Sequence, residues 1–72
     1  MTIQELKESD YVMMFNLKFE GDRMRIPSPH WLSWPIDNAV IREGSGLIEI
    51  EINGKYAITL YKDSRSIHLV II

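Results

Sequence analysis

Apolar and polar residues alternate most regularly in the second half of the chain, over residues 46–61. Leu47–Ile52 alternates isoleucine with glutamate, and Tyr56–Tyr61 is rich in aromatic and β-branched residues. Such alternation is typical of strands with one buried face. Because Asn53-Gly54 favours a tight turn between the two runs, the pattern predicts a β-hairpin.

The register of this hairpin follows from keeping its apolar side chains on one face. A two-residue turn at Asn53-Gly54 would place glutamates and large apolar groups on the same face. A three-residue loop at 52–54, closed by Gly54 as a bulge, keeps the two kinds of side chain apart. We therefore expect the bulged turn, which pairs Ile50 with Tyr56 and Ile48 with Ile58.

A third strand follows at 66–72, after a polar turn at 62–65. A four-residue loop pairs Leu60 with Ile67 and Ile58 with Leu69, and so completes a three-stranded meander over 47–72. The opposite face of this meander ends in an apolar corner, which we expect to form a patch with residues from an earlier strand. Its members are Val12, Met14, Ala57, Val70 and Ile72.

The N-terminal part is predicted to contain a short helix at 2–9 and a β-hairpin at 11–27. Thr2 and Glu5 have the spacing of a capping box. Alternation predicts a long strand over 11–19, and Gly21-Asp22 fits a type II′ turn. The resulting pairs are Glu20 with Arg23, Phe19 with Met24, Leu17 with Ile26, and Lys18 with Arg25.

Residues 27–46 form an aromatic and proline-rich loop. Pro27 ends the preceding strand, and Ser28 with Pro29 is a suitable start for one helical turn at 30–34. A short strand is expected near 39–42, followed by a glycine-rich joint at 44–46.

These elements predict one small domain of 72 residues. Its fold class is mainly β, bordering on α+β: an antiparallel five-stranded curled sheet or barrel with a short N-terminal helix. The order of strands in the sheet is left open. The net charge of −2 and the absence of cysteine exclude disulfides and thiolate chemistry and disfavour bulk affinity for nucleic acid.

The tryptophans of the loop are the strongest candidates for a binding site. Tryptophan is enriched at binding hot spots, so Trp31 and Trp34 are predicted to anchor a partner protein, with His30 and Arg42 as the polar rim. The alternative is that one or both indoles belong to the core.

A second function class is binding of single-stranded nucleic acid by a small β-barrel. In this interpretation Lys18, Arg25 and Tyr61 contact the phosphates and bases from one outer face. Catalytic and metal sites have little support, because the two histidines lack metal-ligand spacing and the serines lie in no nucleophile motif.

We therefore expect a small cytoplasmic, non-enzymatic interaction module without metal or cofactor, acting as adaptor or inhibitor of another protein. No apolar run reaches the length of a membrane span. The bare apolar edge at Val70 and Ile72 also predicts a homodimer. Compact chains without catalytic motifs are common in phage and mobile elements, and such an origin fits this one.

Overall fold

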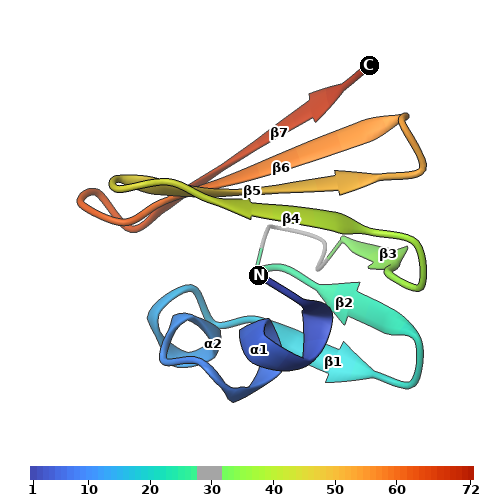
Figure 1. Cartoon of the computed structure of the whole chain (residues 1–72), viewed down its shortest axis with the longest axis horizontal. Helices are drawn as coiled ribbons and strands as arrows, with labels where there is room; N and C mark the ends of the chain where they lie inside the picture. The colour runs from blue at the N-terminus through green and yellow to red at the C-terminus, as the bar shows by residue number, and fades with distance from the viewer. Residues whose placement is uncertain (28–31) are drawn as a thin grey trace.

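The computed structural model describes residues 1–27 and 32–72, which form two layers (Figure 1). One layer is a four-stranded antiparallel sheet, here sheet B. The other contains two short helices and a three-stranded antiparallel sheet, here sheet A. The strands of sheet B, in spatial order, are β4 (Val40–Glu43), β5 (Leu47–Ile52), β6 (Tyr56–Tyr61) and β7 (Ser66–Ile71). The second layer consists of α1 (Ile3–Glu8), α2 (Tyr11–Met14), β1 (Lys18–Glu20), β2 (Arg23–Arg25) and β3 (Ser33–Pro35).

The mainly-β class and the short N-terminal helix are confirmed. The strands of the described residues belong to two sheets instead of a single five-stranded one. Both sheets are open: β1 and β3 are the edges of sheet A, and β4 and β7 are the edges of sheet B. The chain crosses between the layers at residues 36–39, so β3 and β4 lie in different sheets.

The start of α1 has the predicted capping box. The Thr2 amide donates to Glu5 Oε1 at 2.8 Å, and the Glu5 amide donates to Thr2 Oγ1 at 3.1 Å. These bonds satisfy donors that the first helical turn leaves free. The backbone and side-chain hydrogen bonds with Thr2 also hold the pKa of Glu5 below its ordinary value. Leu6 is the fully buried residue of α1, so the helix docks through it.

The predicted long strand over 11–19 is wrong, because its first part is the helix α2. Asn16, with φ +53°, ends this helix in the left-handed region. The Leu17 amide bonds to the Val12 carbonyl at 2.9 Å and the Asn16 amide to the Met13 carbonyl at 3.3 Å, which is a Schellman ending. Met13 is therefore exposed, whereas Phe15, which we expected on the same face, is buried.

The hairpin of sheet A has the expected register. Glu20 is opposite Arg23, Phe19 opposite Met24 and Lys18 opposite Arg25. Gly21 has φ +59°, as a type II′ turn requires at its first central position. Residues 33–35 add the strand β3 on β2, where we expected the end of a helical turn. The rest of that turn, with its predicted start at Ser28 and Pro29, lies outside the described residues.

The turn between β5 and β6 combines features of both turns that we weighed. Asn53 and Gly54 have φ of +52° and +65°, and the Lys55 amide bonds to the Ile52 carbonyl at 3.0 Å, which closes a type I′ turn. Lys55 is then an extra residue before the ladder, so the three-residue loop is 53–55, one residue later than predicted. The ladder pairs Ile52 with Tyr56, Ile50 with Ile58 and Ile48 with Leu60. The expected pairs of Ile50 with Tyr56 and Ile48 with Ile58 are wrong by two residues, although the face is preserved.

The predicted pairs between β6 and β7 are confirmed: Leu60 is opposite Ile67 and Ile58 opposite Leu69. The four-residue turn over 62–65 places Arg65 at φ +55°.

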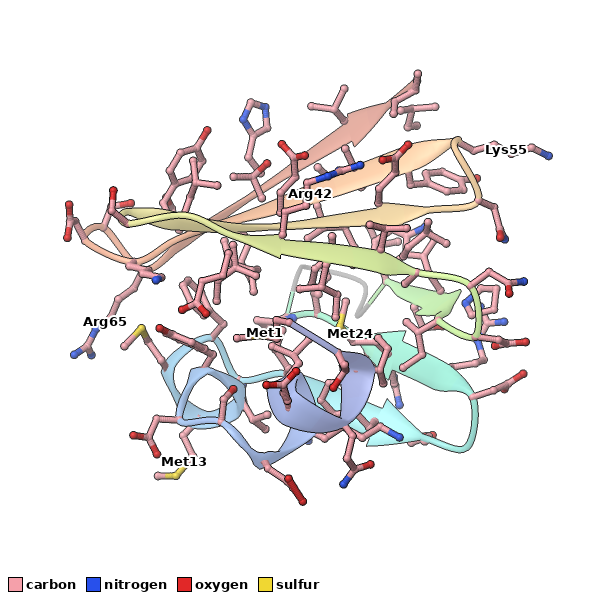
Figure 2. The ribbon with its side chains drawn as sticks, in the orientation of Figure 1. Met1, Met13, Met24, Arg42, Lys55 and Arg65 are labelled. Carbon is pink, nitrogen blue, oxygen red and sulfur yellow. The ribbon has the colours of Figure 1, made fainter. Side chains whose placement is uncertain are left out.

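The core lies between the two layers, and its buried side chains within residues 1–27 and 32–72 are all apolar. Sheet B contributes one face, on which Ile48, Ile50, Ile58 and Leu60 are fully buried. The second layer covers this face with residues of α1, the segment after α2, sheet A and the positions that directly follow β2 and β3. These are Leu6, Phe15, Leu17, Met24, Ile26, Trp34 and Ile36. Figure 2 shows Met24 between the layers. Val12 and Met14 also pack against this core, so they do not belong to the outer apolar patch that we predicted.

Candidate functional site

The two sheets have four edge strands, and three of them are protected against pairing with another chain. β1 and β4 each carry two charged side chains, and β3 contains Pro35. Charges, proline and short length are the usual means of blocking an edge. β7 differs, because it is six residues long and has no lysine, arginine, aspartate, glutamate or proline. Among the described strands, β7 is the unprotected edge.

The direction of the backbone groups of β7 follows from one hydrogen bond at its end. The Ile72 amide donates to the Lys55 carbonyl at 2.7 Å, towards β6. In an antiparallel ladder, a residue presents its N–H and C=O on the same side, and successive residues alternate. His68 and Val70 therefore also bond towards β6. Ile67, Leu69 and Ile71 present their backbone groups away from the sheet.

The side chains of β7 form an apolar strip that the second layer covers incompletely. Ile67, Leu69 and Ile71 are on the core face, but the first two are only partly buried and Ile71 is 74% exposed. On the outer face, Val70 is 44% exposed, and Ile72 beyond the strand is 70% exposed. In Figure 1, β7 is the strand of sheet B farthest from the helices.

Sequence reasoning identified Val70 and Ile72 but assigned the core-facing side of β7 to the buried interior. The cause is the short length of the strands in sheet A, which the sequence pattern did not reveal because it predicted a long strand over 11–19. The strands of sheet A are three residues long, against six for β5, β6 and β7. A layer this short leaves the far strand of sheet B partly uncovered.

Arg42 is on the outer face of sheet B, where it binds two carboxylates of the neighbouring strand. Its guanidinium lies 3.2 Å from Glu49 Oε1 and 3.1 Å from Glu51 Oε2. Figure 2 shows Arg42 pointing away from the second layer. Because all three side chains are solvent-accessible, the ion pairs contribute little to stability. They do neutralise part of the acidic band that the alternating glutamates of β5 create.

Trp34 lies in the core and is only 8% exposed. It is opposite Met24 in the β2–β3 ladder, and its ring centroid is 6.0 Å from that of Tyr56 on sheet B. This placement favours the alternative that we kept for Trp34. The structure does not bring Trp34 and Arg42 together, since one points between the layers and the other away from them. His30 and Trp31 lie outside the described residues.

The candidate nucleic-acid contacts are divided between the two layers. Lys18 and Arg25 are cross-strand neighbours on the outer face of sheet A, where Arg25 also lies 2.9 Å from Glu20. Tyr61 is on the outer face of sheet B. The expected arrangement, with basic and stacking groups on one face, is therefore not present.

A polar cluster that the sequence did not reveal connects α2 to sheet B. Glu43 Oε2 accepts from Tyr11 Oη at 2.9 Å and from Lys62 Nζ at 3.0 Å, and Lys62 Nζ also lies 5.2 Å from the centre of the Tyr11 ring. The hydrogen bonds from Lys62 and Tyr11 hold the pKa of Glu43 below its ordinary value. The bond to Glu43 raises the pKa of Lys62. The hydrogen bond between Tyr11 and Glu43 therefore links the two layers at the surface.

Two shallow clefts are present among the described residues. One, of about 200 Å³, is lined by Ile3, Lys7, Gly21, Asp22, Ile36 and Asp37. The other, of about 300 Å³, is lined by Glu20, Arg23, Arg25 and Ser33. Within residues 1–27 and 32–72, no cluster of three histidine or acidic side chains is arranged to hold a metal ion. Neither described helix is long and apolar enough to cross a membrane.

Comparison with known proteins adds no family assignment. The chain matches no protein-family model, and neither the curated proteins nor the solved structures contain a significant match to it.

Proposed function

We propose that this protein is a small non-enzymatic interaction module that binds another protein by adding a strand of that partner to β7. In this mode, main-chain hydrogen bonds supply affinity, and alternate side chains supply specificity. The observation that carries the proposal is the contrast between the edge strands. β7 alone among the described edges is long and lacks charge and proline, while β1, β3 and β4 are protected.

The chemistry of β7 defines the partner segment. Ile67, Leu69 and Ile71 offer backbone donors and acceptors, so the partner must supply an extended strand. The strip on the core-facing side is apolar, and a partner with β-branched or leucine side chains at alternate positions would cover Ile71 and complete the burial of Leu69. Binding of this kind suits an adaptor or an inhibitor. The absence of cysteine in the chain supports action in the cytoplasm.

The test is a pull-down that compares the wild type with a variant in which one charged side chain blocks pairing at the open edge. Ile71→Lys places a lysine on the edge of β7, the type of substitution that blocks strand addition in natural sheets. Met13→Lys is the matched control, because Met13 is an exposed apolar residue on α2, on the other layer (Figure 2). The affinity tag belongs at the N-terminus, since the C-terminus follows β7 directly (Figure 1).

We expect the wild type and Met13→Lys to capture the same protein from cell lysate, and folded Ile71→Lys to lose it. Circular dichroism establishes that both variants fold. Equal capture by both variants would contradict the proposal. If the wild type instead recovers nucleic acid, and this binding weakens as the salt concentration rises, the result would support the alternative function of single-stranded nucleic-acid binding.

A further inference from the structure

The backbone groups on the open edge of β7 are arranged symmetrically. Leu69 is the middle of the three residues whose N–H and C=O point outward, with Ile67 and Ile71 two positions away on either side. Two residues directly opposite each other in an antiparallel pair exchange two hydrogen bonds only when the backbone N–H and C=O groups of each residue point towards the other strand. A two-fold axis perpendicular to sheet B satisfies this condition when it passes through Leu69.

From this symmetry we infer that, when no other partner is bound, β7 pairs with β7 of a second copy of the chain. Leu69 is opposite Leu69 of the second copy, and Ile67 is opposite Ile71. Each of these pairs exchanges two hydrogen bonds, and every outward group of β7 is used. Moving the axis by one residue, to His68 or Val70, leaves one outward residue of each copy outside the pairs.

The side chains fit the same register. On the core-facing side, the opposed residues are all leucine or isoleucine, so the strip that the second layer leaves uncovered is covered by its own copy. On the outer side, His68 is opposite Val70. Because β7 has no lysine, arginine, aspartate or glutamate, self-pairing places no like charges opposite each other.

This inference rests on the proposed function, since both use the open edge of β7, and it adds a regulation to that function: the dimer masks the docking strand. The contact involves one strand from each copy, less than a standard interface of about 1,600 Å². We therefore expect a reversible dimer with a dissociation constant on the order of micromolar, which a protein partner with more contacts can displace.

Sedimentation velocity of the purified chain over a range of concentrations tests the self-association. The wild type and Met13→Lys should pass from monomer to dimer as the concentration rises. Ile71→Lys should weaken the dimer by roughly tenfold or more, because the two-fold axis introduces the lysine twice. A wild type that stays monomeric up to several hundred micromolar would overturn the inference, as would equal dimerisation of Ile71→Lys.

Single cysteines test the register, since the chain has none of its own. Opposite residues in a hydrogen-bonded pair have Cα atoms about 5.5 Å apart, within reach of a disulfide. Under mild oxidation Leu69→Cys should cross-link faster than His68→Cys or Val70→Cys, whose own copies lie about 8 Å away in this register. Met13→Cys measures random collision. Fastest cross-linking at position 68 or 70 would contradict the axis at Leu69.

The two proposals fail in different ways. A wild type that is monomeric but still captures a partner through β7 would remove the dimer and leave the docking function intact. If both Ile71→Lys and Met13→Lys lose the partner, but only Ile71→Lys weakens the dimer, the docking function through β7 is removed and the dimer stands.

Discussion

Replacement of Trp34 by alanine distinguishes a core tryptophan from a binding anchor. Trp34 is 8% exposed, is opposite the fully buried Met24 and contacts Tyr56 on the other layer. A buried tryptophan removes about 150–250 Å² from water, which at about 25 cal/mol per Å² corresponds to roughly 4–6 kcal/mol as an upper bound. Measured Trp→Ala substitutions in cores cost about 3–5 kcal/mol.

This cost is large for a chain of this length. At about 0.05–0.15 kcal/mol per residue, the free energy of unfolding of a 72-residue domain is about 4–11 kcal/mol. We therefore expect Trp34→Ala to unfold much of the population or to lower the urea midpoint severely. Trp34→Phe keeps an aromatic ring against Tyr56 and should lose less than half as much.

The assay is urea unfolding followed by far-ultraviolet circular dichroism, because the substitution removes one of two indoles and alters the fluorescence itself. Met13→Ala is the control. Its side chain is 86% exposed, so its unfolding free energy should stay within about 0.5 kcal/mol of the wild type. A folded Trp34→Ala within about 1 kcal/mol of the wild type would refute the packing argument and restore Trp34 as a surface anchor.

Three further substitutions test separate parts of the fold by the same unfolding assay. The folded-state pKa of Glu43 is depressed, so the stabilising effect of its carboxylate is present above the unfolded pKa and is lost as pH falls through the folded pKa. The difference in unfolding free energy between wild type and Glu43→Gln should therefore close on acidification. A difference that does not change with pH would contradict this. Thr2→Ala removes the cap of α1 and should cost about 1 kcal/mol, while no loss would show that the capping box is not needed. Gly54→Ala has open space for its methyl group but φ +65°, so it should cost about 1 kcal/mol through backbone strain alone, and a neutral result would exclude that turn geometry.

The sequence predicted well where local rules and tertiary packing agree. The capping box of α1, the β1–β2 register and the β6–β7 register all follow from residues close together in the chain. At β5–β6 the face was predicted correctly, but the pairs were shifted. Asn53 and Gly54 close a type I′ turn and Lys55 is inserted after it, and alternation alone cannot distinguish this from a bulge one residue earlier.

The errors arose where one pattern fits two structures. The spacing of Tyr11, Val12 and Phe15 fits one face of a helix, and the alternation over 11–19 fits a strand equally well. The helix is the structure that forms, and Asn16 ends it in the left-handed region. Trp34 carried no sequence signal for burial, because its partners Met24 and Tyr56 come from two different sheets. The candidate edge was half predicted: Val70 and Ile72 follow from composition, whereas the exposure of Ile71 depends on how far the second layer reaches.

The most direct test of the central claim, that β7 is an open docking strand, is hydrogen exchange measured amide by amide at concentrations low enough to keep the chain monomeric. The structure predicts alternation along β7: the amides of Ile67, Leu69 and Ile71 exchange rapidly, and those of His68 and Val70 are protected by β6. Raising the concentration, or adding a captured partner, should protect the first three. Equal protection of all five amides in the dilute monomer would show that the edge is already covered and would contradict the claim.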